Sequence, residues 1–149
     1  MKGFLMYHVP RGRLSFVDEL YVQSHFRKQN VAKSLFAAIS GGPIELIVDK
    51  KNANAIALYT SLGFCNNDKG IYEPGEDEFC MKTTSFKRTR AKLASLLLQN
   101  TRTYTWQDLS EVNRESMIEG LRTAWGGSRG SARRSLRVTD SSIRYVIVE

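Results

Sequence analysis

The residues whose types and spacing point most directly to chemistry lie between Arg27 and Lys33, in the stretch RKQNVAK. This stretch joins residues 14–22, which alternate like a strand, to residues 31–39, which have helical spacing. A sharp turn into a helix presents consecutive backbone N–H groups without partners inside the helix, at the positive end of the helix dipole. Such a helix start binds phosphate, so the sequence predicts an anion site here.

Three segments together carry a family resemblance. The first is the turn itself, Arg27-x-x-Asn30-x-Ala32, the second is NxxAxxLYxxLGF over residues 52–64, and the third is residues 72–82, which look like a closing hairpin. In this order the segments resemble the GNAT superfamily of acetyl-CoA-dependent N-acetyltransferases, over roughly the first 85 residues. The family's loop has glycine where this chain has Asn30. Asn tolerates a positive φ better than other non-glycine residues, so the loop remains workable if this position needs one.

The resemblance implies a set of residues that hold acetyl-CoA. Arg27 would brace the loop or add charge to it, the alternative being a surface salt bridge. Asn52 would contact the arm of acetyl-CoA. The backbone groups of three residues would pair with the pantetheine arm as if it were an added strand; these residues are Leu20, Tyr21 and Val22. One of their N–H groups would also polarise the thioester carbonyl. The pyrophosphate would lie on the turn formed by Lys28, Gln29, Asn30, Val31, Ala32 and Lys33.

The same resemblance implies two catalytic residues. Tyr59 would protonate the leaving thiolate, and Asp18 would accept the proton of the attacking amine, directly or through water. The alternatives are a core aromatic ring for Tyr59 and an ion pair or solvated charge for Asp18. Because side chains alternate along a strand, residues 16, 18, 20 and 22 should share one face and Glu19 the other. The two histidines, His8 and His25, have no partner pattern and are interpreted as structural, and no metal-site spacing is present.

The expected elements predict an α/β (α+β) fold with a mixed sheet and flanking helices. Strands over residues 3–9 and 14–22 form a hairpin, and a helix (31–39), a buried strand (44–48) and a helix (52–62) follow. A full GNAT domain has a strand, two helices and another strand before this hairpin, and these are missing here. We therefore expect a truncated GNAT-type core whose open edge is covered by the C-terminal part or by a second subunit in a homodimer.

Charge divides the chain near Thr84. Residues 1–83 carry 10 Lys or Arg against 9 Asp or Glu, whereas residues 84–149 carry 12 against 6. The sequence thus predicts a GNAT-like acetyl-CoA-binding core at residues 1–84 and a basic extension at residues 85–149 that meets an anionic partner. Helical spacing over 87–99 and 116–125, a helix start at 105–109, a basic loop at 128–135 and a hairpin of 136–138 with 143–148 resemble a winged helix. The other interpretation is a basic extension that packs on the core.

Composition narrows the class of protein. The chain is 42% hydrophobic and 25% charged, which is typical of globular domains. No apolar run approaches the roughly 18 residues that span a bilayer, and a signal peptide is not expected, so no membrane partner is predicted. Cys65 and Cys80 lie in apolar, strand-like settings and are interpreted as buried free thiols, which favours an intracellular, cytoplasmic protein.

The favoured function is transfer of the acetyl group of acetyl-CoA, as co-substrate, to a primary amine by direct attack and without a metal. The acceptor remains open: a protein lysine, an N-terminus, a polyamine or an aminoglycoside. The alternative is a nucleic-acid-binding protein with a degenerate GNAT core and an Arg-rich, winged-helix-like C-terminal part. A third interpretation combines the two, with the basic part recruiting an acetyltransferase to nucleic acid.

Overall fold

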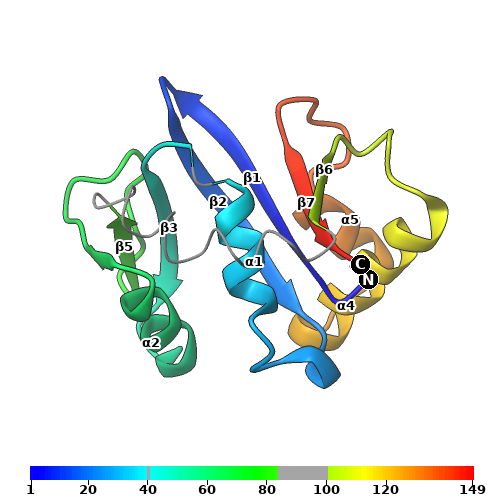
Figure 1. Cartoon of the computed structure of the whole chain (residues 1–149), viewed down its shortest axis with the longest axis horizontal. Helices are drawn as coiled ribbons and strands as arrows, with labels where there is room; N and C mark the ends of the chain where they lie inside the picture. Colours follow the sequence, from blue (N-terminus) through cyan, green and yellow to red (C-terminus); the bar gives the residue numbers. More distant parts are fainter. Residues whose placement is uncertain (40, 84–100) are drawn as a thin grey trace.

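The computed structural model describes residues 1–39, 41–83 and 101–149 (Figure 1). Within these residues, one seven-stranded mixed sheet has the order β4-β5-β3-β2-β1-β7-β6. Its strands are β1 (Gly3–Arg11), β2 (Leu14–Val22), β3 (Ile44–Asp49), β4 (Phe64–Asn66), β5 (Glu78–Thr83), β6 (Thr101–Tyr104) and β7 (Arg144–Val148). The helices are the 3-10 turn η1 (Ser24–Phe26) and α1 (Val31–Ala38), α2 (Ala53–Ser61), α4 (Glu111–Trp125) and α5 (Arg129–Ser135). The predicted fold class is confirmed.

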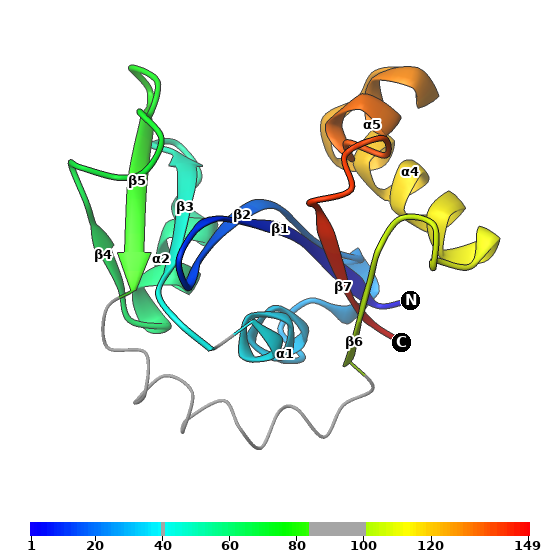
Figure 2. The ribbon, with the colours of Figure 1, turned by 90° about the horizontal axis from the view of Figure 1, so that it is seen from above.

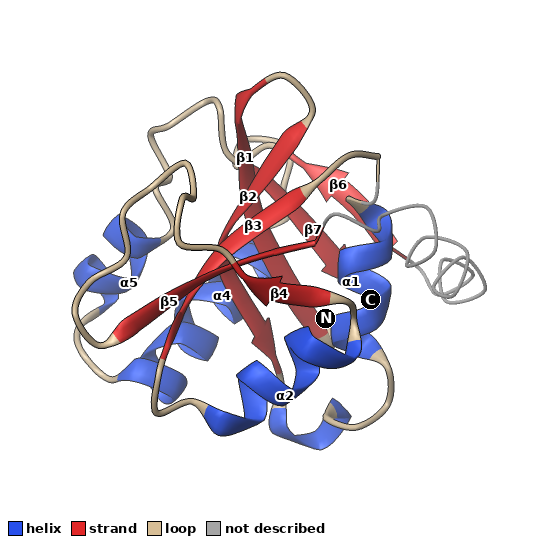
Figure 3. Ribbon diagram, turned by 90° about the vertical axis from the view of Figure 1, so that its left-hand side faces the viewer, coloured by secondary structure: helices blue, strands red, loops and turns tan. Residues whose placement is uncertain are grey.

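The N-terminal half follows the predicted order closely. β1 and β2 form an antiparallel hairpin closed by Gly12 and Arg13, and Gly12 takes the positive φ of 54° that this tight turn needs. α1 then crosses to β3, which pairs in parallel with β2, and α2 leads to the β4–β5 hairpin at the sheet edge. The sheet is strongly twisted, so β5 crosses β1 and β2 at a wide angle in Figure 3.

The two faces of the sheet carry different helices and separate cores. α1 and α2 cover one face, and α4 and α5 cover the other (Figure 2). On the first face Leu35, Phe36 and Tyr59 pack with Leu5 and Val17 of the hairpin. The core of the second face contains Phe4, Met6, Met117, Ile118, Leu121, Ala132, Leu136, Tyr145 and Ile147. Because β1 contributes alternate residues to both cores, the hairpin is buried on both sides over much of its length.

The C-terminal part is not a winged helix. Residues 136–138 form no strand, so the predicted hairpin with residues 143–148 is wrong, and β7 pairs instead with β1 and β6. Residues 128–135, predicted as a loop, contain α5, because Ser128 caps the helix through Ser131 N–H and Ala132 is buried. The predicted helix over 116–125 belongs to the longer α4, capped by Ser110. The predicted helix over 87–99 lies outside the described residues.

The edge that was expected to be open is filled by this C-terminal part. β7 adds to β1 with Gly3 opposite Val148, and Lys2 N–H donates to Val148 O at 2.7 Å, so the two marked ends of the chain are neighbours (Figure 1). The resemblance expects a strand, two helices and another strand before the hairpin. β6, α4, α5 and β7 supply the same four elements, in the same order, after β5. The predicted boundary near Thr84 therefore does not divide the sheet.

Two further expectations have different outcomes. Cys80 is a buried free thiol as predicted, but Cys65 is exposed at the start of the β4–β5 hairpin, so that part of the prediction is wrong. Among the described residues, none of the helices has the length and apolar character needed to cross a membrane.

Candidate active site where two strands diverge

The parallel pair at the centre of the sheet separates partway along its length. β2 and β3 pair only from Ser15 to Val17 with residues 44–46, although β2 continues to Val22. In the described part of the chain, the β3-facing edge of β2 beyond Val17 has no strand partner. Figure 1 shows the two strands moving apart toward their C-terminal ends. Leu20, Tyr21 and Val22 lie on this stretch, so their backbone groups could accept an extended ligand as an added strand.

The predicted anion loop follows directly. Asn30 is the N-cap of α1 with φ 63° and ψ 17°, the left-handed conformation that Asn tolerates. The first hydrogen bond of the helix runs from Ser34 N–H to Asn30 O, so the amides of Val31, Ala32 and Lys33 precede it. Lys28 also has a positive φ, 59°, and Gln29 donates to His25 O at 2.9 Å. Two left-handed residues thus wind the backbone tightly in front of the helix.

Two contacts fix this loop against the hairpin. Arg27 Nε donates to Val22 O at 3.2 Å, which is the bracing role rather than the surface salt bridge. Val31 is buried over Gly3, where an added Cβ would come within 2.6 Å of Tyr21 O. The helix start is therefore held at the end of the unpaired stretch of β2.

A bulge in β2 changes which side chains share a face. Met6 lies opposite Glu19 but Tyr7 lies opposite Val17, so Asp18 is an extra residue on β2. Asp18 and Glu19 consequently both point toward the face covered by α4 and α5, whereas Leu20 and Val22 pack with Val17 on the other. The predictions that Leu20 and Val22 share the face of Asp18, and that Glu19 lies opposite, are both wrong for this reason.

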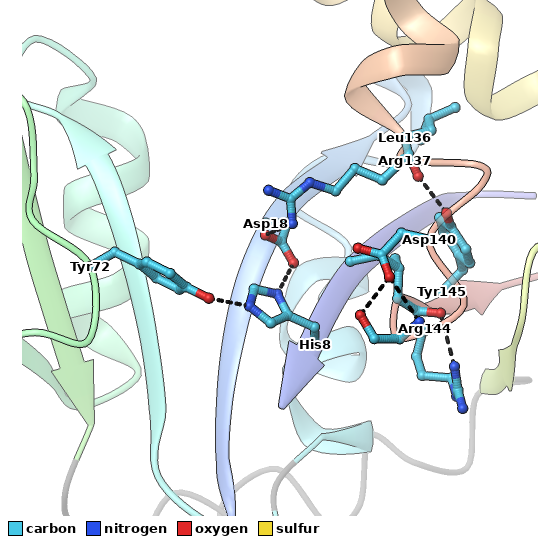
Figure 4. A network of polar contacts seen from close by, with 10 residues as sticks. His8, Asp18, Tyr72, Leu136, Arg137, Asp140, Arg144 and Tyr145 are labelled. Atoms are coloured by element: carbon cyan, nitrogen blue, oxygen red, sulfur yellow. Dashed lines mark hydrogen bonds and ion pairs between the residues drawn. The ribbon is translucent and has the colours of Figure 1, made fainter. Parts of the chain in front are cut away.

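Asp18 belongs to a network of polar side chains (Figure 4). Its Oδ2 lies 2.7 Å from His8 Nδ1, and its Oδ1 lies 3.5 Å from Arg137 Nη1. His8 Nε2 lies 2.7 Å from the hydroxyl of Tyr72, in the loop between β4 and β5. Burial raises the pKa of Asp18, against the lowering effect of the His8 hydrogen bond. Asp18 is thus bound on both oxygens.

Two anchors hold the partners of Asp18. Arg137 has φ 50°, a strained conformation for a residue other than glycine, in the turn between α5 and β7; the Tyr145 hydroxyl donates to Leu136 O beside it. On the other side, Glu45 of β3 is 2% exposed and accepts from Ile71 N–H at 2.8 Å. Glu45 therefore ties the Tyr72 loop to the sheet.

Glu19 has different surroundings. It lines a cavity of about 140 Å³ between β2, the end of α4 and α5. The backbone N–H of Leu20 and the indole of Trp125 lower the pKa of its carboxylate, but burial outweighs them and raises the pKa of Glu19 to about 7. A carboxylate with this pKa exchanges a proton near neutral pH.

Tyr59 approaches the same strand from the opposite face. It lies in α2 at 9% exposure, with its ring 5.9 Å from Phe36 and 5.7 Å from Phe64 between centroids. Burial, and then the charge of Glu19, raise the pKa of Tyr59 to about 12. Asn52 caps α2 by accepting from Ala55 N–H at 3.2 Å. The predicted acid is therefore electrostatically coupled to a carboxylate that the sequence interpretation set aside.

Comparison with known proteins identifies the architecture. No family model matches the chain, and no curated protein does. Among solved structures, a Klebsiella pneumoniae protein described as an acyl-CoA N-acyltransferase aligns with TM-score 0.50 and 20% identity, over 54% of this chain and 61% of its own. The chain therefore shares the fold of this acyl-CoA N-acyltransferase.

Two other solved structures with this fold are similar. A GNAT-family acetyltransferase from Staphylococcus aureus gives TM-score 0.49 and 17% identity, over 56% of this chain and 59% of its own. The PaiA N-acetyltransferase of Thermoplasma acidophilum, in complex with coenzyme A, gives 0.48 and 17%, over 55% and 52%. The chain thus matches between half and two thirds of the length of these GNAT structures.

Proposed function

We propose that this chain transfers the acetyl group of acetyl-CoA to a primary amine by direct attack on the thioester. The observation that carries the proposal is that Glu19, on the unpaired stretch of β2, and Tyr59, in the core on the opposite face of the sheet, lie close enough for the charge of Glu19 to raise the pKa of Tyr59. Acetyl transfer to an amine needs one group that accepts a proton and another that donates one. A carboxylate with pKa about 7 and a phenol that stays protonated meet these needs.

Backbone groups of β2 and of the turn before α1 are assigned to bind acetyl-CoA. The unpaired edge formed by Leu20, Tyr21 and Val22 would pair with the pantetheine arm, and the amides before Ser34 would bind the pyrophosphate. The left-handed Asn30 supports this assignment, because it lets the chain turn without glycine. Asn52 caps α2 with one lone pair of its side-chain oxygen, so its NH₂ group and the second lone pair of that oxygen are left for the substrate.

The two proton transfers are assigned to the side chains on the two faces of the sheet, Glu19 and Tyr59. An acceptor that binds as an ammonium first loses one proton to solvent. The neutral amine nitrogen then forms the new C–N bond to the thioester carbonyl carbon, and Glu19 takes a second proton. The C–S bond breaks, and Tyr59 gives its hydroxyl proton to the departing sulfur. Solvent then restores both side chains.

Asp18 remains the other candidate base. Its two oxygens are occupied by His8 and Arg137, so we assign it to positioning of the site and assign proton removal to Glu19. In this arrangement the Asp18 carboxylate holds Arg137 and, through His8, the loop that carries Tyr72.

The test combines binding and turnover. Calorimetric titration with acetyl-CoA should give micromolar affinity, and free thiol should then appear only when a primary amine is added. Absence of heat up to millimolar acetyl-CoA would overturn the proposal. So would binding without thiol release across alkyl amines, peptide N-termini and aminoglycosides.

A further inference from the structure

The cavity beside Glu19 has a floor and walls of different chemistry. Glu19 of β2 forms the floor, and the walls are Leu121, Trp125 and Gly126 at the end of α4 and Ser131, Ala132 and Ser135 of α5. α4 ends at Gly126, whose φ of 76° requires glycine or a strained residue. Trp125 is 69% exposed, although its indole reaches the Glu19 carboxylate. The cavity is therefore open to solvent beside a large aromatic side chain.

The half-buried Glu19 carboxylate lacks a cation. Across residues 1–39, 41–83 and 101–149, no Lys, Arg or His lies within ion-pair distance of Glu19. The nearby arginines have other partners, since Arg122 pairs with Glu119 at 2.8 Å and Arg129 with Glu115 at 2.7 Å. Burying a carboxylate without a counter-ion is unfavourable, so a cationic ligand would bind here with a gain that a neutral one lacks.

The walls indicate which cation fits. Leu121 and Ala132 are apolar and buried, and the indole beside them can hold an ammonium by cation–π attraction. The Ser131 hydroxyl already donates to Ser128 O at 2.9 Å. An amide placed against these walls would lose its hydrogen bonds to water, whereas methylene groups would not.

We infer that this cavity binds the ammonium end of an unbranched alkyl amine, the group found at the tip of a lysine side chain and in alkyldiamines. The methylene chain lies along Leu121 and Ala132, the nitrogen meets Glu19, and Trp125 closes one side. The cavity of about 140 Å³ is close in size to one that holds roughly six carbon-sized atoms, so four methylenes and an ammonium, which are five heavy atoms, fit within it. This inference rests on the proposed function and names its acceptor class.

A competition among amines tests the inference. Nα-acetyl-lysine amide and 1,4-diaminobutane should exceed alaninamide, which carries an α-amine beside an amide, by at least about tenfold in kcat/KM. A preference for the lysine derivative over the diamine would indicate a protein acceptor, and the reverse a free polyamine. Alaninamide as the better substrate would overturn the inference and leave the acetyltransferase in place. Loss of turnover on every amine would instead count against the proposed function.

Cavity variants provide the second readout. Ser135→Leu should fill the mouth and raise KM for the lysine derivative by about tenfold, with unchanged acetyl-CoA affinity. Ala124→Leu, on the exposed side of α4 and outside the lining, is the matched control and should leave KM unchanged. Trp125→Ala should raise KM, and Trp125→Phe should restore much of the loss. Equal KM in Ser135→Leu and Ala124→Leu would refute the cavity as the acceptor site.

Discussion

His8 Nδ1 on β1 lies 2.7 Å from Asp18 Oδ2 on β2, beside the bulge that inserts Asp18 into the strand pair. The other nitrogen of the ring lies 2.7 Å from the Tyr72 hydroxyl, so one histidine joins the hairpin to a loop some sixty residues away in sequence. Glu19, the next residue of β2, lines the cavity and has no ion-pair partner among the residues that the structure describes. Two adjacent carboxylates of one strand therefore differ in role, and they can be tested separately.

Glu19→Gln should lower kcat/KM by at least about a hundredfold, because the proton acceptor is lost while shape is kept. In the unmodified protein kcat/KM should rise with pH and level off above about 7, since Glu19 must be deprotonated to act. Asp18→Asn should reduce activity less and retain this inflection. The measurement is a pH profile of thiol release for the three proteins. An inflection that disappears in Asp18→Asn and survives in Glu19→Gln would assign the base to Asp18 instead.

The raised pKa of Glu19 also predicts how stability depends on pH. The folded protein holds this proton up to about pH 7, whereas the unfolded chain releases it near 4.5. The folded state binds more protons between these values, so the contribution of Glu19 to stability is full below pH 4.5 and is lost as pH rises through 7. Urea unfolding at pH 5 and pH 8 should show Glu19→Gln more stable than the parent mainly at pH 8. An equal difference at both pH values would contradict the burial of this charge.

Tyr59→Phe should lower kcat by on the order of a hundredfold with little change in acetyl-CoA affinity. The ring remains packed on Phe36 and Phe64, so only the hydroxyl is removed. Phe36→Leu serves as a control for disturbed packing, because it changes the same core without touching the hydroxyl. Single-turnover kinetics and calorimetry measure the two quantities. An unchanged kcat would remove Tyr59 from the mechanism.

Asn30 should tolerate glycine but not a β-branched residue. At φ 63°, Asn30→Val costs about 1–2 kcal/mol of unfolding free energy, and it should also weaken acetyl-CoA binding because the amides before Ser34 shift. Asn30→Gly should keep both stability and affinity. Urea unfolding and calorimetry distinguish the two variants. If Asn30→Val binds acetyl-CoA as tightly as the parent protein, this turn is not part of the acetyl-CoA site.

A reordered chain should adopt the same sheet. If residues 101–149 precede residues 1–100, Glu149, Met1 and Lys2 form a short loop between Val148 and Gly3, which already face each other as neighbouring antiparallel strands. This order also puts the strand, two helices and strand before the β1–β2 hairpin. We expect cooperative unfolding and the acetyl-CoA affinity of the parent. A chain that stays unfolded would show that the natural order is required.

Much of the N-terminal half could be predicted because its signals are local. Alternation in residues 14–22, helical spacing from Val31 and the Gly63 stop of α2 gave element bounds within a residue or two of the structure. The face assignments failed beyond Val17, since a bulge adds one residue and reverses the alternation without any sequence mark. That single residue is why Glu19 was placed on the wrong face, whereas Asp18 was chosen from the family resemblance.

The remaining differences come from long-range contacts. The partners of His8 are Asp18 and, more distant in sequence, Tyr72, so no local pattern could give it a role. α5 contains Gly130 and two serines, which favour a loop, but Ala132 and Leu136 bury against α4 and stabilise it. The strand β7 was predicted correctly, but its pairing with β1 was not, because β1 lies at the other end of the sequence.

The position of β7 has a consequence for how the protein is made. Its five residues complete the interior of the sheet, between β1 and β6, and are synthesised long after β1, to which they pair. Until then the outer edge of β1 has no strand to pair with, and contacts across nearly the whole sequence must form late, which favours slow folding. A nascent chain stalled before Arg144 should therefore depend on chaperones far more than a chain that includes β7 does.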